Sequence, residues 1–135
     1  MKQESFLERR PYIIADFTSE RSEIGFYLTN IGKTPAKNIK VKIVPDIVKF
    51  NGDTLNSSIF NEEISFFPPH KKVETTINTT SIYFRENSDH YIVKLNYTDS
   101  FNNKFSEEIN LNLNHHKKKS YLVEKDLQNV IDSLE

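Results

Sequence analysis

The residues of this chain that could carry chemistry are four histidines and several adjacent carboxylates. His115 and His116 are neighbours, so in an extended segment their imidazoles face opposite sides and cannot readily bind one metal ion together. His70 and His90 lie in or beside predicted turns, with no carboxylate at a spacing that metal sites use. The sequence therefore predicts no metal site, and we interpret these histidines as solvent-exposed turn residues.

Catalysis by acids, bases or nucleophiles finds little support. The adjacent pairs Glu62–Glu63 and Glu107–Glu108 diverge to opposite faces within a strand, so neither forms the facing dyad that acid–base chemistry needs. Glu107 shares its alternation with Ile109, which indicates a strand-end residue or a paired inward charge. The three glycines are scattered, cysteine is absent, and no Gly-x-Ser-x-Gly elbow occurs. We therefore predict a protein that is not an enzyme and has no cofactor.

The composition of the chain bears on its size class and on nucleic-acid or membrane association. The 135 residues are enough for one domain, and a hydrophobic content of 36% can supply its core. Lys and Arg number 18 against 19 Asp and Glu, and neither half of the chain is polarised. A nucleic-acid partner is therefore not expected, because such proteins usually carry a basic excess. No apolar run approaches the length of a membrane span, and the first residues do not resemble a signal peptide.

The elements that would carry these residues follow from the alternation of polar and apolar side chains. The period is two along almost the whole chain, as in half-buried strands. The alternation is clearest where Ile39, Val41 and Ile43 are separated by single polar residues. The predicted strands are Pro11–Phe17, Glu23–Asn30, Lys37–Val44, Ile47–Phe50, Glu63–Phe67, Val73–Thr79, His90–Thr98 and Lys104–Leu113. This pattern is typical of an antiparallel β-sandwich.

The periodicity changes near the C-terminus. After Ser120, a suitable N-cap, apolar side chains recur at helical spacing, which predicts an amphipathic helix. A helix of this length is marginal alone in water, so it must pack on its own domain, on a second copy or on a partner. The predicted organisation is an N-terminal arm at 1–10, a β-sandwich at 11–113, a polar linker at 114–119 and the helix at 120–135.

Aromatic rings are the one surface signal in the sequence. Phe66 and Phe67 are adjacent, as are Tyr83 and Phe84, and neighbours in a strand cannot both point inward. Some of these rings must lie at a loop or an edge. There they would suit a protein contact, or they would cap the core from a loop. The candidate contact residues are Phe66, Phe67, Tyr83 and Phe84 on the sandwich, with Leu127 and Ile131 on the helix.

One run of residues is similar to a known group of domains. Asn-Ile-Gly-Lys-Thr-Pro-Ala-Lys-Asn at 30–38, followed by an alternating strand, resembles the Asn-x-Gly-x-x-Pro-Ala-x-Asn turn of small bacterial and phage immunoglobulin-like domains, akin to the adhesion-related CARDB sandwiches. The Arg-Pro-Tyr run at 10–12, the Phe-Pro-Pro run at 67–69 and the Tyr-x-Val-x-Leu-x-Tyr-x-Asp run at 91–99 support the resemblance. With the strands around these runs, the resemblance covers roughly residues 9–113.

The turn at 30–38 suggests a role for each of its small or rigid residues. We expect Gly32 to take a positive φ where the chain reverses, and Pro35 to stiffen the exit from the turn. Ala36 is small enough to fit beneath the crossing between the sheets. The group's usual glycine after the proline turn is His70 here, and its usual glycine in the last hairpin is replaced within 100–103, so the alignment is weaker at these two turns.

The resemblance implies an all-β fold, an immunoglobulin-like antiparallel β-sandwich of about seven to eight strands, here with a C-terminal α-helix. It implies little about function, because sandwiches host unrelated functions. We expect a non-enzymatic protein-interaction module of bacterial or phage origin that binds a protein partner or self-associates through the helix. Two alternatives remain: a phage or mobile-element accessory that inhibits a host protein, and a carbohydrate- or ligand-binding sandwich. Relatives are often membrane-anchored, so a cytoplasmic protein or the soluble part of an anchored one is expected.

Overall fold

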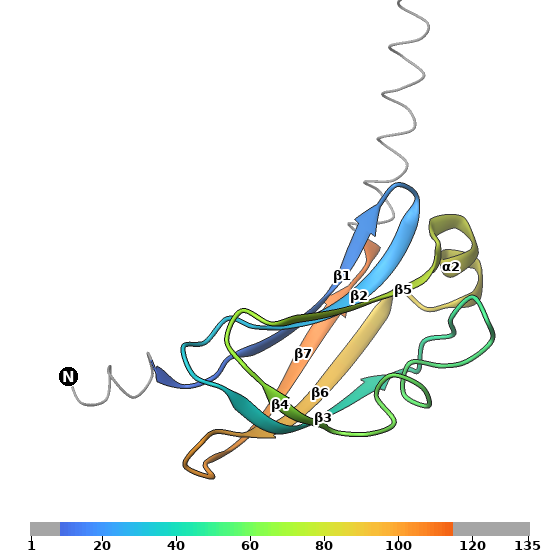
Figure 1. Cartoon of the computed structure of the whole chain (residues 1–135). Helices are drawn as coiled ribbons and strands as arrows, with labels where there is room; N and C mark the ends of the chain where they lie inside the picture. Colours follow the sequence, from blue (N-terminus) through green and yellow to red (C-terminus); the bar gives the residue numbers. More distant parts are fainter. Residues whose placement is uncertain (1–8, 115–135) are drawn as a thin grey trace, which may run out of the picture.

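Two antiparallel β-sheets form the fold of residues 9–114, the part of the chain that the computed structural model describes (Figure 1). The three-stranded sheet has the order β1-β2-β5, and the four-stranded sheet has the order β4-β3-β6-β7. The strands are β1 (Ile13–Glu20), β2 (Glu23–Asn30), β3 (Ala36–Val44), β4 (Ile64–Phe67), β5 (Lys72–Thr79), β6 (His90–Thr98) and β7 (Lys104–Asn112). The predicted all-β class is confirmed, and β2 and β6 have the predicted bounds.

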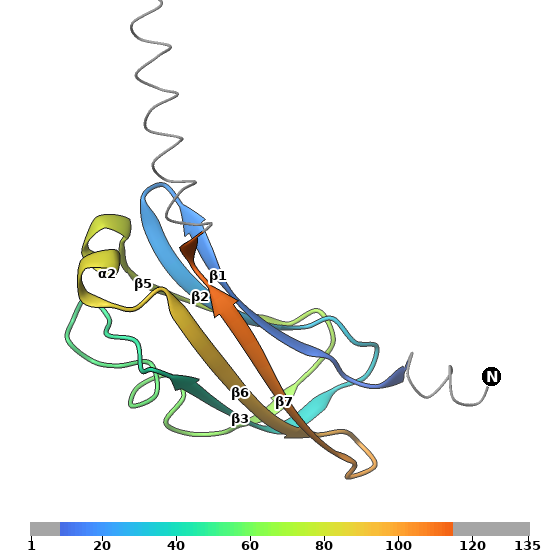
Figure 2. The ribbon, with the colours of Figure 1, turned by 180° about the vertical axis from the view of Figure 1, so that it is seen from behind.

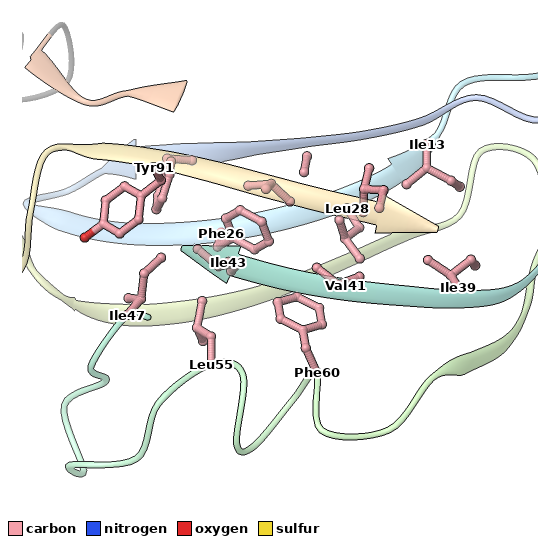
Figure 3. Close-up of a cluster of buried hydrophobic side chains, with 14 of the residues drawn as sticks. Ile13, Phe26, Leu28, Ile39, Val41, Ile43, Ile47, Leu55, Phe60 and Tyr91 are labelled. Atoms are coloured by element: carbon pink, nitrogen blue, oxygen red, sulfur yellow. The ribbon is translucent and has the colours of Figure 1, made fainter. Parts of the chain in front are cut away.

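The hydrophobic core lies between the two sheets (Figure 3). Along β3, buried and exposed side chains alternate, so Ile39, Val41 and Ile43 point into the core as the sequence predicts. Phe26 of β2 packs edge-to-face on Phe17 of β1, with ring centroids 5.3 Å apart. Each large apolar side chain buried in this way stabilises the fold by roughly 1.5–3 kcal/mol. The largest fully buried side chains are Tyr83, Tyr97, Phe26, Phe67, Ile13, Ile24, Leu28, Ile39, Ile43, Ile47, Leu55 and Ile77.

The long connection between β3 and β4 corrects one predicted strand. Residues 47–50 form no named strand, and the only pairing there is an isolated bridge between Val48 and Thr54 around the Asn-Gly-Asp turn. The apolar side chains of this segment instead turn inward from a loop. Ile47, Leu55 and Phe60 are buried against the sheets (Figure 3). Short apolar runs do not distinguish a strand from a loop that closes the side of a core.

A short helix, α2 (Thr80–Glu86), connects β5 to β6 and was not predicted. It has seven residues, fewer than two complete turns, so it offers too little periodicity for the sequence to reveal it. The helix places the Tyr83 ring in the core, where its centroid lies 6.3 Å from that of Phe17. Because helical neighbours are rotated by about 100°, Phe84 lies only partly buried beside it.

The connections divide between the two ends of the sandwich (Figures 1 and 2). The segment that enters β1 lies at one end with the β2–β3, β4–β5 and β6–β7 connections, and we call this the loop end. The β1–β2 turn, α2 and the β3–β4 connection lie at the other end. The predicted linker and helix lie outside the described residues, except for Asn114. Within residues 9–114, no helix is long and apolar enough to cross a membrane.

Candidate functional site

Two residues with polar or charged side chains, Asn30 and Asp99, are buried among the described residues, and both lie at the loop end. Asn30 is the last residue of β2, and its side chain is 0% exposed. Its Oδ1 accepts hydrogen bonds from the backbone N–H groups of Tyr12 (3.1 Å) and Gly32 (2.9 Å). Its Nδ2 donates to the carbonyl oxygens of Thr34 and Phe67, each at 3.0 Å. One side chain therefore joins the entry to β1, the β2–β3 turn and the end of β4.

The β2–β3 turn exposes an apolar side chain on this rigid base. Ile31 follows Asn30 directly, and 58% of its surface is exposed. Its own N–H donates to the carbonyl oxygen of Tyr12 at 2.8 Å, so the backbone that carries the side chain is fixed. A Cβ on Gly32 would lie 2.4 Å from the carbonyl oxygen of Arg10. The glycine is therefore required by close backbone contact, and the predicted positive φ is wrong, since Gly52 is the positive-φ glycine in the described part of the chain.

Asp99 organises the β6–β7 hairpin in the same way. The side chain is 4% exposed, and its Oδ1 accepts hydrogen bonds from the N–H groups of Phe101 and Asn103, both at 2.9 Å. Its Oδ2 accepts a third from Nδ2 of Asn103 at 2.9 Å. Burial alone would raise the pKa of Asp99, but these hydrogen bonds outweigh it and hold the pKa below its ordinary value. The hairpin tip that they fix presents Phe101, which is 83% exposed.

Replacement of Asp99 by Asn should make the stability of the domain less dependent on pH. The lowered pKa means that ionised Asp99 stabilises the folded state above its ordinary pKa of about 3.9, and that this stabilisation disappears as pH falls through the folded-state pKa. Asp99→Asn should therefore cost about 1–2 kcal/mol at pH 7. The difference from the unmodified chain should shrink toward pH 3. Urea unfolding at a series of pH values measures both, and a constant difference would contradict the hydrogen-bond explanation.

A charged network holds the entering segment against β7. Nη2 of Arg10 donates to Oε1 of Glu107 at 2.8 Å and to the hydroxyl of Tyr97 at 3.1 Å, and that hydroxyl donates to Glu107. The guanidinium also lies 4.0 Å from the ring centroid of Tyr12 and 4.1 Å from that of Phe105. Burial and then the bond to Glu107 raise the pKa of Tyr97 to about 12. Glu107 is thus the paired inward charge that its alternation indicated.

The predicted contact residues are not brought together by the fold. Phe66 projects outward from β4 and is 52% exposed, so its ring remains available to a partner. Phe67 and Tyr83 are each 0% exposed and belong to the core, so their prediction as contact residues does not hold. Phe84 is partly buried and packs against Tyr83, with ring centroids 5.2 Å apart. The two helix candidates, Leu127 and Ile131, lie outside the described residues.

Sequence reasoning missed the two most prominent apolar side chains of the loop end. Ile31 and Phe101 both lie within turns, where the alternation of a strand no longer tells which side chains face inward. The available signal was a large apolar residue between turn-forming neighbours, as in the Asp-Ser-Phe-Asn-Asn run at 99–103.

Within residues 9–114, no group of three or more His, Cys, Asp or Glu side chains could hold a metal ion.

Comparison with known proteins gives a family and distant structural likenesses. A Northeast Structural Genomics Consortium target is 13% identical, with 78% of this chain and 87% of that chain covered and a TM-score of 0.29. A Bordetella pertussis protein described as ApaA is also 13% identical, with 76% and 91% covered and a TM-score of 0.31. No curated protein matches the chain. A family model matches residues 1–117, so the chain belongs to the family described as domain of unknown function DUF8453.

Proposed function

We propose that this domain is a non-enzymatic protein-interaction module that binds its partner through the loop end. The observation that carries the proposal is the display of Ile31 and Phe101, 58% and 83% exposed, on turns whose backbones are fixed by buried Asn30 and Asp99. Large apolar side chains at an exposed site contribute strongly to binding when a partner's pocket removes them from water. Tyr12, 40% exposed at the same end, extends this apolar surface.

The hydrogen bonds beneath the loop end support recognition by a preformed surface. The N–H of Ile31 is bound to Tyr12, and the N–H of Phe101 is bound to Asp99. Loops that are already ordered lose little conformational entropy when a partner binds, so more of the contact free energy appears as affinity. Such loops on a rigid scaffold are a common site of protein function.

We also propose that the sandwich is of the immunoglobulin-like type. The sheet orders β1-β2-β5 and β4-β3-β6-β7 support this proposal, because strands from both halves of the chain alternate between the two sheets as they do in that architecture. In immunoglobulin-like domains, loops at one end of the sandwich commonly form the binding surface. Asn30 and Gly32, which belong to the resembling turn, both contribute to the geometry of the loop end.

Replacing the aromatic side chain at the hairpin tip by a charged one should strongly reduce partner capture. We expect the Phe101→Asp variant of the full chain to recover at least about tenfold less partner from a lysate of the source cell, since loss of a buried aromatic anchor costs more than 1.4 kcal/mol. Phe50→Asp is the matched control, because Phe50 is 68% exposed in the connection at the other end. Quantitative mass spectrometry of the captured proteins provides the measurement.

The two aspartate variants also define the outcomes that contradict the proposal. Equal thermal stability of both variants and the unmodified chain would show that the substitutions affect only the surface. Loss of partner with Phe50→Asp but not with Phe101→Asp would move the contact to the opposite end. Equal capture by all three proteins would exclude both ends and leave the sheet faces as the site.

A further inference from the structure

The outer faces of the two sheets carry opposite charges. Strand alternation directs five lysines outward from the four-stranded sheet. These are Lys37, Lys40 and Lys42 on β3, Lys94 on β6 and Lys104 on β7. The acidic residues of the same face are Glu63, just before β4, and Glu108 on β7. The outward charges of the three-stranded sheet are Asp16, Glu20, Glu23 and Glu74, with Lys72 alone opposing them. The net charge of −1 therefore conceals a basic face and an acidic face.

Three of the lysines, Lys37, Lys40 and Lys104, lie toward the loop end of the basic face, whereas Lys42 and Lys94 lie level with the middle of β6. Lys42 of β3 lies directly opposite Lys94 of β6. Lys37 lies opposite Thr98, which in turn lies opposite Lys104 of β7. Like charges directly opposite each other destabilise a sheet. Lys94 also lies directly opposite Glu108 of β7, so this carboxylate offsets part of the repulsion between Lys42 and Lys94.

Most of this charge has no internal partner. Of the five lysines, Lys40 alone forms an ion pair within residues 9–114, with Glu63 at 3.9 Å, and Lys94 has Glu108 as its cross-strand neighbour. Both side chains of that pair are well exposed, so the contact contributes little. Five lysines against two glutamates thus leave the face with a net positive charge toward a ligand.

A groove of about 530 Å³ lies on this face where the charges are concentrated. It is lined by Asn38, Lys40, Glu63, Asn96, Tyr97, Thr98, Lys104, Phe105 and Ser106. Asn38 adopts a φ of +52° where the pairing of β3 with β6 shifts register, so the backbone irregularity lies in the groove wall. Lys40 and Lys104 place ammonium groups on two of its strands, with amide and hydroxyl side chains beside them.

These side chains fit a peptide backbone better than a nucleic acid. Asn and Thr side chains both donate and accept hydrogen bonds, as peptide groups require, whereas phosphodiesters only accept. The ring of Phe105 already stacks on Tyr97 and lies against Arg10, so it does not offer a free platform for bases. Lys40 and Lys42, two residues apart on one strand, are separated by about 7 Å, the spacing of alternate side chains in an extended segment.

We infer that this groove, together with the lysines of the basic face, binds an acidic peptide segment in an extended conformation. Carboxylates at alternate positions of the segment pair with Lys40 and Lys42 on β3, and a further carboxylate pairs with Lys104 on β7. The amide and hydroxyl side chains of the groove meet its peptide groups. This site lies beside the β6–β7 hairpin but uses none of the apolar side chains at its tip, so it can hold a second part of the same partner or a different partner.

Titration of the isotopically labelled full chain with a short capped peptide of alternating Glu and Thr tests the inference by nuclear magnetic resonance. At low ionic strength we expect saturable shifts of β3, β6 and β7 amides near the groove. The double variant Lys40→Glu, Lys104→Glu should raise the dissociation constant at least about tenfold. The matched control Lys71→Glu, Lys72→Glu changes the net charge equally, away from the groove, and should leave binding almost unchanged. The uncharged substitution Phe101→Ala should also leave it almost unchanged, which separates this site from the apolar tips of the loop end.

Several results would overturn the inference. Equal weakening by the two double variants would show a general effect of net charge. Absence of saturable shifts, or shifts confined to other surfaces, would exclude the groove as a peptide site. Tighter binding of oligothymidylate than of the peptide would assign the face to single-stranded nucleic acid. Concentration-dependent shifts of the same amides without peptide would assign it to the acidic face of a second copy.

Discussion

The Asn30→Ala variant should lose about 3–5 kcal/mol of its free energy of unfolding, because buried groups that lose their hydrogen-bond partners cost about 1–3 kcal/mol each. Four backbone groups depend on the Asn30 side chain: the N–H groups of Tyr12 and Gly32 and the carbonyl oxygens of Thr34 and Phe67. All four connect segments that meet at the loop end. Urea unfolding followed by circular dichroism measures the change.

Two further asparagine variants make this prediction specific. Asn30→Asp keeps the acceptor for Tyr12 and Gly32 but replaces the amide donor with a carboxylate facing two carbonyl oxygens. It should therefore be strongly destabilised as well. Asn110→Ala removes an exposed asparagine from β7 and should cost less than about 0.5 kcal/mol. A loss with Asn30→Ala no larger than that with Asn110→Ala would show that water or rearrangement replaces the buried bonds.

The Gly32→Ala variant should be destabilised by about 3 kcal/mol, because a methyl group there meets backbone atoms that cannot move separately from the sheet. The added Cβ would lie 2.4 Å from the carbonyl oxygen of Arg10, 2.6 Å from the nitrogen of Tyr12 and 2.7 Å from Cα of Pro11. The entering segment would have to move away from the β2–β3 turn. Hydrogen exchange at the amide of Tyr12, which bonds to Asn30, should accelerate in this variant.

Gly52→Ala is the informative control for this substitution. Gly52 has a φ of +89° and open space where a Cβ would stand, so its replacement strains only the backbone conformation. The expected cost is about 1–2 kcal/mol. A larger loss at Gly52 than at Gly32 would mean that backbone conformation, and not close contact with the entering segment, limits this fold.

The strands were predictable where one face meets the core and the other meets water. In β6, Tyr91, Val93 and Leu95 are buried while the residues between them are exposed, and the sequence shows the same alternation. The segment at 47–50 looked similar, yet it is a loop that fills the side of the core. Local pattern alone does not record which neighbour a segment packs against.

The basic face was less predictable than the strands, because it arises from the pairing of strands that are far apart in the sequence. Alternation correctly placed the lysines of β3 on one face, but only the register brings Lys94 and Lys104 beside them. Charges that are evenly distributed along the chain are therefore separated in space. Gly32 is a second example. The turn motif correctly singled out this glycine, but the backbone atoms that leave no room for a side chain there belong to Arg10 and Pro11, about twenty positions earlier in the sequence.

The placement of the two chain ends has a mechanical consequence. The described chain enters the sandwich at the loop end and leaves β7 at the opposite end (Figures 1 and 2). Tension between these two points acts along the strands. The hydrogen bonds between β1 and β2, and those between β6 and β7, are then loaded in shear and must yield together rather than one after another. The ion pair between Arg10 and Glu107 adds a further connection between the segment that enters β1 and strand β7.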